Sequence, residues 1–361
     1  MSRYMPNPPP YQFEGSDGEP EAKIAIMGAT GTGKSSFIKS ITNDEEIVVG
    51  HSLQSQTAKI HRSRYFVPNS SACITFIDTP GFDDSRGAAG GMTDADVLRK
   101  IATFLKAEYD QNQKLAGIIY MHRIIDPRMG NSSQRNLRMF KKLCGAESMK
   151  NVVIITTMWD KLESPQEGEQ RELELKTKEG FFKTLIDQGA QLVRLGRGVA
   201  GPKFPPADQI VSDIITHSQP EFTRIQTEMA KGAELEDTSA GAELDGEIRK
   251  LKQQHEFEMK QLREEMMEAM RDRDMRAVRE LEEERRRNEM VVQRLDEELR
   301  QLQDGLNYSR AEMQRMMMQE QQERENQRAA WERRSSHRRG IGGLVGGILT
   351  AGALTVLLAP L

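Results

Sequence analysis

Two hydrophobic patterns alternate along residues 21–220. Short runs that are apolar throughout, or that alternate apolar with polar residues, have the length and composition of strands. These runs are 23–27, 61–67, 72–77, 117–121, 152–156 and 191–195. The intervening segments predict helices over 35–42, 93–109, 132–143, 172–188 and 209–217. The alternation predicts a three-layer α/β domain in which helices cover both faces of a mostly parallel sheet.

A different pattern follows this domain. Residues 221–243 are interrupted by glycines and acidic residues and predict a linker. Residues 244–335 contain no proline, and their apolar positions recur at a period near 3.5, which is typical of a coiled coil. The period is poor between Met266 and Met290, so we expect a weak or interrupted coil there. A single solvated helix is the alternative, but so thin an apolar stripe buries little alone and pairing is favoured.

The two ends of the chain have compositions of their own. Residues 1–20 are Pro-rich and polar and predict a disordered leader. Residues 340–361 carry no charged side chain and follow a basic cluster, which is the pattern of a membrane anchor with its basic flank in the cytosol. A Gly-rich hairpin packed on protein is the alternative. We therefore expect a cytoplasmic protein, which tail insertion would anchor to the cytosolic face of an intracellular membrane.

Composition narrows the classes of function. The chain of 361 residues has 51 Lys and Arg against 55 Asp and Glu, a net charge of -4 that does not favour nucleic acid as a partner. With 37% hydrophobic and 29% charged residues, a polytopic membrane protein is excluded. Cys73 and Cys144 are too few for a disulfide framework. The histidines show no ligand spacing, so they predict no metal site.

The strongest chemical signal is a match to G-x-x-x-x-G-K-[ST] at residues 28–35. The segment leaves a predicted strand and opens a predicted helix, where backbone N–H groups can cradle a phosphate. Lys34 is expected on the β- and γ-oxygens, and the Ser35 hydroxyl on Mg²⁺. The residues expected to bind the nucleotide here are Gly28, Thr30, Gly31, Thr32, Gly33, Lys34, Ser35 and Ser36.

Two further segments indicate which nucleotide binds. Asp-Thr-Pro-Gly at 78–81 ends a predicted strand, where Asp78 would bind Mg²⁺ through water and the Gly81 amide would meet the γ-phosphate. Thr157 and Asp160 follow the strand at 152–156. The Asp160 carboxylate can accept two hydrogen bonds from guanine, which adenine cannot donate, so GTP and GDP are the predicted ligands. The alternatives are that Asp160 only caps a turn, or that the protein uses ATP.

In order and spacing, these three segments resemble the boxes of P-loop GTPases, most closely the septin, Toc and immunity-associated (GIMAP/AIG-type) group. Residues 120–126 and 143–145 look like the fungal branch of such proteins. The resemblance implies a P-loop NTPase fold, a G domain over 21–220. It also implies that Thr57 is the switch I threonine that closes on Mg²⁺ and the γ-phosphate, with Ser55 as the competing candidate. The fifth guanine box is left unassigned.

One departure from small GTPases bears on mechanism. They place a Gln directly after the glycine of the D-x-x-G box to orient the attacking water, and here that residue is Phe82. We therefore expect slow hydrolysis in the monomer. The resembled families often pair their domains face to face, which implies a homodimer in which Arg86 or Arg123 supplies positive charge across the interface. A plain surface position is the alternative for both arginines.

The sequence thus predicts a GTP-binding switch with slow, dimerisation-dependent GTP hydrolysis on a coiled-coil stalk. The residues expected to act directly in catalysis are Lys34, Thr57 and Gly81, and those expected to hold Mg²⁺ are Ser35, Thr57 and Asp78. The coil would raise the local concentration of G domains and favour the homodimer. The alternative function is a nucleotide-stabilised scaffold that leaves GTP intact.

Overall fold

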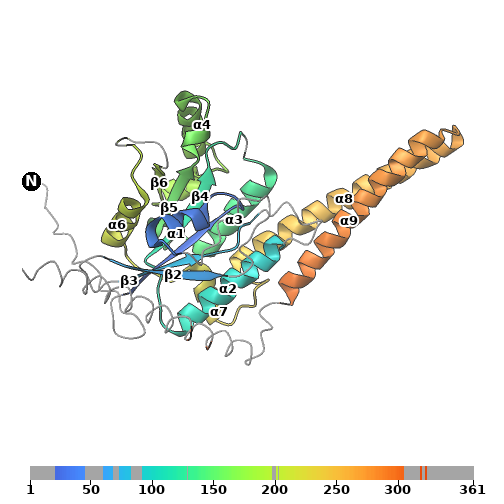
Figure 1. Ribbon diagram of the computed structural model, residues 1–361. Coiled ribbons are helices and arrows are strands. Elements are labelled where there is room, and N and C mark those ends of the chain that lie inside the picture. The colour runs from blue at the N-terminus through green and yellow to red at the C-terminus, as the bar shows by residue number, and fades with distance from the viewer. Residues whose placement is uncertain are drawn as a thin grey trace, which may run out of the picture. The chain divides into compact units, whose positions relative to one another are not determined.

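The computed structural model describes residues 21–44, 60–67, 73–82, 92–127, 129–196, 201, 203–304, 318 and 322. The chain divides into two units, residues 1–306 and 307–361. The first unit contains all the strands and helices that follow (Figure 1).

The six predicted strands form one sheet with the order β2-β3-β1-β4-β5-β6 within the described residues. They are β1 (Glu21–Gly28), β2 (His61–Phe66), β3 (Cys73–Asp78), β4 (Gly117–Arg123), β5 (Val152–Thr157) and β6 (Gln191–Arg194). Every neighbouring pair is parallel except β2 and β3, which are antiparallel. The predicted mostly parallel α/β sheet is confirmed.

Helices cover both faces of the sheet, also as predicted (Figure 1). On one face, Ile24 and Ile26 of β1 lie in a core cluster with α1 (Lys34–Thr42) and α6 (Ala207–His217). On the other face, the alternate residues Ala25 and Met27 lie in a cluster with several helices. Those helices are α2 (Asp94–Asp110), α3 (Asn131–Cys144), α5 (Lys183–Asp187) and α7 (Arg224–Ala230). β1 is therefore buried on both sides, as a central parallel strand requires.

The helix predicted over 172–188 is two helices in the structure. The first, α4 (Pro165–Thr177), begins earlier because the Ser164 hydroxyl accepts a hydrogen bond from the N–H of Glu167 and Pro165 follows the cap. It is separated from α5 by Gly180, whose φ of +82° a helix cannot contain. Two short 3-10 turns, η2 (Met149–Asn151) and η3 (Trp159–Lys161), flank β5.

The expected linker at 221–243 is part of the packed domain. It contains α7, where Thr223 and Gln226 form a capping box and Ile225 is fully buried. Gln226 also donates a hydrogen bond to the carbonyl of Leu105 in α2. The structure differs from the sequence-based interpretation because the apolar residues of this segment are few and scattered, yet Ile225, Met229 and Leu235 are buried.

The predicted coil is a helical hairpin as far as the structure describes it. The helices α8 (Ser239–Arg271) and α9 (Met275–Gln303) pair antiparallel, with Lys252 bonded to Asp296 at 2.5 Å and His255 to Asn288 at 3.1 Å. The turn between them includes Arg273 at φ +56°. It lies in the stretch where the apolar period is poor and where a weak or interrupted coil is predicted. The seam therefore pairs within one chain over 244–303, and no single continuous helix spans these described residues.

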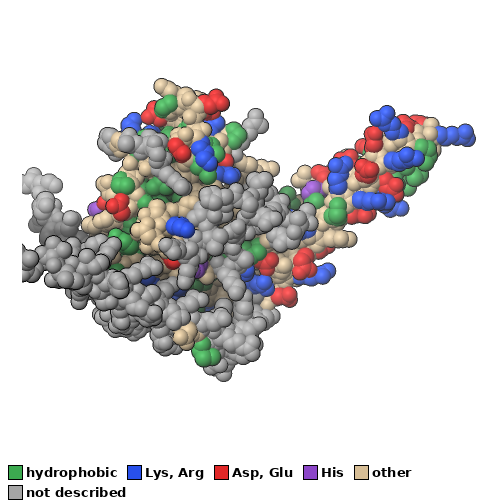
Figure 2. All heavy atoms as spheres, viewed as in Figure 1, with side chains coloured by type: hydrophobic (Ala, Val, Ile, Leu, Met, Phe, Trp, Pro, Cys, Tyr) green, Lys and Arg blue, Asp and Glu red, His purple; other side chains and the backbone are tan. Residues whose placement is uncertain are grey.

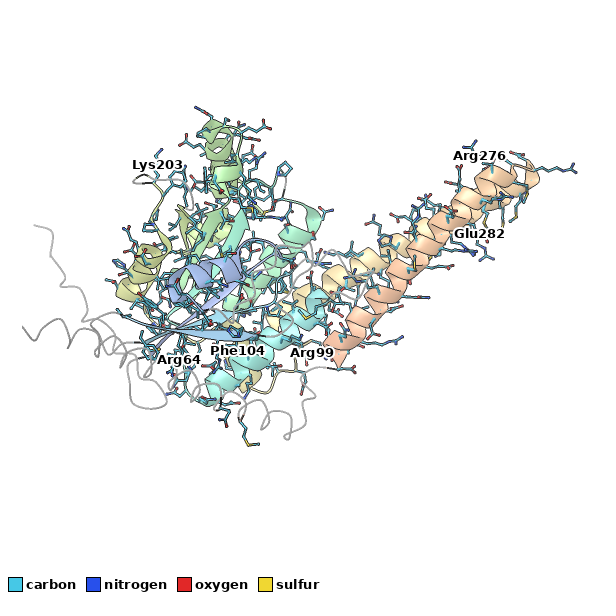
Figure 3. All side chains as sticks on the ribbon, in the orientation of Figure 1. Arg64, Arg99, Phe104, Lys203, Arg276 and Glu282 are labelled. Atoms are coloured by element: carbon cyan, nitrogen blue, oxygen red, sulfur yellow. The ribbon has the colours of Figure 1, made fainter. Side chains whose placement is uncertain are left out.

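The surface of this hairpin is mixed in charge. Figure 2 shows acidic and basic side chains interspersed along it. Figure 3 marks Arg276 and Glu282 on the half of α9 that lies away from the sheet. Several of these charges pair one helical turn apart, as Arg276 does with Glu280, which stabilises exposed helices modestly.

The remaining predicted segments cannot be compared with the structure. Residues 1–20 and 340–361, the leader and the tail, lie outside the described residues, as does 305–335 except for positions 318 and 322. Among the residues that are described, none of the helices combines the length and the apolar character needed to cross a bilayer.

Candidate nucleotide-binding site

The loop between β1 and α1 is bent by glycines. Gly31 and Gly33 have φ of +78° and +95°, in the left-handed region that favours glycine. At Gly28, a Cβ atom would lie 2.4 Å from the carbonyl oxygen of Met121, so this position also requires glycine. Because the residue before α1 is Gly33, no side chain at that position caps the helix. The first N–H groups of α1 can therefore bind an anion.

Lys34 points back over this loop. Its ammonium donates to the carbonyl oxygens of Gly28 and Ala29, at 3.1 and 3.0 Å. Burial lowers the pKa of Lys34 to about 8, and the Asp78 carboxylate opposes that shift. A buried cation of this kind is stabilised by a phosphate placed within its reach.

Ser35 and Asp78 meet at the adjacent edge of the sheet. The Ser35 hydroxyl donates to Asp78 Oδ2 at 2.6 Å. The other carboxylate oxygen, Oδ1, is buried and has no hydrogen-bond partner in the described part of the chain. Burial raises the pKa of Asp78, while the Ser35 hydrogen bond and Lys34 lower it. A hydroxyl and an unsatisfied carboxylate oxygen fit the oxygen ligands that Mg²⁺ prefers, so these residues suit the predicted metal site.

Backbone hydrogen bonds join the D-x-x-G segment at 78–81 and the following Phe82 to the glycine loop between β1 and α1. The N–H of Thr30 donates to the carbonyl of Phe82 at 2.9 Å, and the N–H of Phe82 donates to the carbonyl of Gly28 at 3.3 Å. A Cβ on Gly81 would lie 2.5 Å from Thr30 Oγ1, so only glycine fits there. The Phe82 side chain is fully buried in the core, which keeps it out of the site.

The predicted base-binding residues lie at the end of β5. Thr157 is buried, and its hydroxyl donates to the carbonyl of Thr32 at 3.0 Å, which ties this segment to the phosphate loop. Met158 adopts φ of +63°, a conformation that is uncommon outside glycine. Asp160, in η3, is exposed and available to a ligand. Thr157 thus ties the end of β5 to the loop between β1 and α1, and Asp160 presents an exposed carboxylate to a ligand.

Two residues that the sequence analysis did not select hold this loop in place. The indole N–H of Trp159 donates to the Thr156 hydroxyl at 3.0 Å. The guanidinium of Arg194, at the end of β6, lies 4.4 Å from the centre of the Trp159 ring and bonds to both oxygens of Glu172. The position of Trp159 between Thr157 and Asp160 was the one signal in the sequence, since Arg194 belongs to a later strand, β6, that meets Trp159 only in the folded chain.

The structure brings together the residues predicted from all three segments. The glycine loop, Asp78, Gly81, Thr157 and Asp160 lie at or just beyond the carboxyl ends of the parallel strands β1, β3 and β5. Ligands of open α/β sheets bind at this edge. Ser36 follows Ser35 in the first turn of α1 and is partly buried.

Other predicted residues are placed differently or lie outside the described residues. Thr57, Ser55 and Arg86 belong to the second group. Arg123 ends β4, and its Nη1 atom is 3.4 Å from the point where a Cβ of Gly31 would be. Its Nε atom bonds to Asp126 at 3.1 Å. Arg123 therefore lies beside the glycine loop of its own chain.

Residues 23–157 match the family model described as 50S ribosome-binding GTPase, MMR_HSR1. This part of the chain is a P-loop GTPase domain. The predicted fold and the resemblance to P-loop GTPases are confirmed over that segment, while the fungal branch stays a prediction. No curated protein sequence matches the chain.

Solved structures resemble the chain over about its GTPase domain. Toc33 from Arabidopsis thaliana in complex with Mg²⁺ and GMPPNP is 17% identical, with a TM-score of 0.41 over 56% of this chain and 88% of that one. A structure of the chloroplast translocon components atToc33 and psToc159, in which dimerisation is important for GTPase activity, is 18% identical, with a TM-score of 0.43 over 55% and 84%. The G domain of the T. maritima FeoB iron transporter is 17% identical, with a TM-score of 0.32 over 54% and 96%.

Proposed function

We propose that this protein is a GTP-binding switch that hydrolyses GTP slowly and works with Mg²⁺. The observation that carries the proposal is the contact between Ser35 and Asp78, 2.6 Å apart, beside a glycine loop bent around the ammonium of Lys34. In this arrangement a helix N-terminus, a buried cation and two oxygens suited to a metal ion lie together at one edge of the sheet.

Each group has a distinct role in this proposal. The backbone N–H groups of residues 31–35 bind the phosphates, and Lys34 exchanges its bonds to Gly28 and Ala29 for the β- and γ-oxygens. Ser35 and Asp78 would hold Mg²⁺, with Thr57 or Ser55 completing the set as the resemblance implies. Bound Mg²⁺ would neutralise negative charge on the β- and γ-phosphates.

The proposed preference for guanine rests on Asp160. Its carboxylate is exposed at the end of a loop that Thr157 ties to the phosphate loop through Thr32. Trp159 and Arg194 fix the same loop from the other side. A carboxylate held in this way can accept hydrogen bonds from both N–H groups of guanine, so GTP and GDP are the proposed ligands.

Slow hydrolysis is proposed because the residue after Gly81 cannot orient water. Phe82 lies in the core, and its backbone is bonded to the glycine loop. In the full proposal, hydrolysis is accelerated by a homodimer that pairs through the GTPase domain, with Arg86 or Arg123 acting across the interface. The expected pairing of two chains through the coil is left out over 244–303, because α8 and α9 pair with each other there. Arg123 also lies beside Gly31, which gives it a second proposed role, contact with the phosphates of the nucleotide bound to its own chain.

A second candidate function is a nucleotide-stabilised scaffold that does not hydrolyse GTP, and the burial of Phe82 favours it. A cytoplasmic location, with the tail at 340–361 anchored to the cytosolic face of an intracellular membrane, remains part of the proposal. Single-turnover measurements on GTP with Mg²⁺ separate the two functions, since a scaffold leaves GTP intact for hours. A rate that rises with protein concentration would support the dimer.

The nucleotide assignment can be tested on the purified full-length chain. Bound nucleotide is extracted and identified, and the affinities for GDP, GTP and ATP are measured by calorimetry. Asp160→Asn should weaken GDP binding and improve xanthosine diphosphate binding. Asp187→Asn, at an exposed aspartate that pairs with Lys183, is the matched control and should change neither. Tighter binding of ATP than of GTP, or an unchanged base preference in Asp160→Asn, would reject the assignment.

A further inference from the structure

Thr30 lies where the phosphate loop meets the D-x-x-G segment. Its Oγ1 atom is 2.5 Å from the point where a Cβ of Gly81 would be, and its N–H is bonded to the carbonyl of Phe82. The Gly81 amide is the group expected to meet the γ-phosphate. The Thr30 hydroxyl therefore borders the place where the γ-phosphate of GTP would lie in the proposed function.

The Thr30 hydroxyl differs from the other threonine hydroxyls around the site. Thr32 donates to the carbonyl of Ala29, Thr79 to the carbonyl of Ile26, and Thr157 to the carbonyl of Thr32. Thr30 Oγ1 is buried and has no hydrogen-bond partner among the residues that the structure describes. Since buried polar atoms are normally satisfied, an unpaired hydroxyl at this place indicates a group that a ligand completes.

The reaction needs a group of this chemistry. Phe82 replaces the glutamine that orients water in small GTPases, and its ring is enclosed in the core. Asp78 and Lys34 have contacts with Ser35 and with the loop carbonyls. A threonine hydroxyl can accept one hydrogen bond while it donates another, which is what the attacking water and a phosphate oxygen together require.

We propose that Thr30 is a catalytic residue of this GTPase domain, whose hydroxyl accepts a hydrogen bond from the attacking water and donates one to a γ-phosphate oxygen. This inference rests on the proposed GTP hydrolysis. The water oxygen forms a bond to the γ-phosphorus while the bond from that phosphorus to the β–γ bridging oxygen breaks. The bridging oxygen keeps the electron pair and leaves with GDP. The water proton passes to a phosphate oxygen, and Thr30 retains its own proton.

The test uses two variants of the full chain. Thr30→Val preserves the shape of the side chain and removes the hydroxyl, and Thr30→Ser keeps the hydroxyl. In single-turnover assays with Mg²⁺, Thr30→Val should lower the rate of GTP hydrolysis by about 100-fold, the effect of losing one positioned donor. Thr30→Ser should recover most of that rate. Thr103→Val is the matched control, because the Thr103 hydroxyl only bonds to the carbonyl of Arg99 in α2.

Binding measurements distinguish a catalytic role of the Thr30 hydroxyl from a purely structural one. Thr30→Val should lower the affinity for GDP with fluoroaluminate, which mimics the transition state, far more than it lowers the affinity for GDP alone. A Thr30→Val variant that hydrolyses GTP at the wild-type rate, or that loses GDP affinity as strongly as rate, overturns the inference while the proposed function stands. A wild-type protein that does not bind or does not hydrolyse GTP overturns the proposed hydrolysis, and the inference with it.

Discussion

The backbone N–H of Ala95 donates a hydrogen bond to the carboxylate of Glu298, at 3.3 Å, across 203 positions of sequence. Beside this contact, the Thr93 hydroxyl lies 2.5 Å from the side-chain oxygen of Gln301. The last turns of α9 therefore meet the first turn of α2, whose N–H groups and dipole favour an acidic partner. The hairpin leaves the domain at α8 and returns to it through α9.

Leu302 should stabilise this return. Its side chain is fully buried in the core cluster shared with α2 and α3. Leu302→Ala should lower the free energy of unfolding by about 2–5 kcal/mol, the usual cost of such a cavity, as measured by urea denaturation. Met290→Ala, at a residue of α9 that is 62% exposed, should change it by no more than about 0.5 kcal/mol. Equal effects of the two substitutions would contradict the described packing of α9.

Glu298 should make stability depend on pH. Burial raises the pKa of its carboxyl above the ordinary value of 4.5, and the charge of Asp94 adds to this, while Arg135, the Ala95 N–H and Arg294 oppose it. Because the folded state holds the proton more tightly than the unfolded chain, this group's contribution to stability falls as the pH rises from 4.5 through the raised pKa.

The Glu298→Gln substitution tests this dependence. It keeps an oxygen that can accept from Ala95 and removes the buried charge, so the melting temperature should exceed that of the wild type at pH 8 and the difference should shrink toward pH 5. Glu297→Gln, at an exposed glutamate of the same turn near Arg300, is the control. A wild type and a Glu298→Gln variant whose melting temperatures follow parallel curves would show that Glu298 does not titrate in this range.

Arg194 should support base binding from outside the site. Arg194→Ala removes the stack on Trp159 and both bonds from Arg194 to the nearly buried Glu172 carboxylate, which keeps its bond to Lys176. The loss should cost about 1–3 kcal/mol of folding stability. The affinity for GDP should fall as well, because the loop that presents Asp160 loses its support. Arg194→Lys should rescue little, since an ammonium cannot reproduce the planar, two-bond contact.

The control for Arg194 is Lys203→Ala. Lys203, marked in Figure 3, is exposed and bonds to Glu169, a second acidic partner of Arg194. Its removal should leave both the melting temperature and the GDP affinity close to those of the wild type. Calorimetry measures the GDP affinity and the melting temperature of the three variants. A GDP affinity that is unchanged in Arg194→Ala would show that Trp159 holds the loop without Arg194.

Removal of Mg²⁺ tests whether Ser35 is a metal ligand. Chelation of Mg²⁺ should weaken GTP binding to the wild type. Ser35→Ala should lower the affinity for Mg²⁺ by at least about 10- to 100-fold, the range seen when even indirect metal partners are lost. Ser40→Ala is the control, because the Ser40 hydroxyl bonds only to the carbonyl of Phe37 within α1. If chelation weakens GTP binding equally in Ser35→Ala and in the wild type, Ser35 is not a metal ligand.

The sheet and the phosphate loop could be predicted because their signals are local. A run such as 152–156 specifies a buried strand by its own composition, and the loop at 28–35 requires glycines for reasons that one segment contains. Contacts between distant segments could not be predicted in this way. The bond from Ala95 to Glu298 joins two ordinary helical positions, and the apolar period of α8 and α9 indicates pairing without identifying the partner.

The same limit applies within the candidate site. The sequence predicted Asp78 and Ser35 as metal ligands, and the structure places the two side chains in contact, while metal binding itself stays a prediction. Nothing in the sequence indicated that Arg194 would lie on Trp159. The strand β6 becomes a neighbour of the loop after β5 only when the sheet assembles. Thr30 was included only as one member of the phosphate loop, and its unpaired hydroxyl depends on the approach of Gly81.

The burial of Phe82 limits how this domain could evolve. A glutamine in place of Phe82, the residue that orients water in small GTPases, would enclose a carboxamide in a space shaped for a phenyl ring. A faster enzyme is therefore reached more readily by changing residues around the loop, or by recruiting a second protein, than by placing a glutamine at this position.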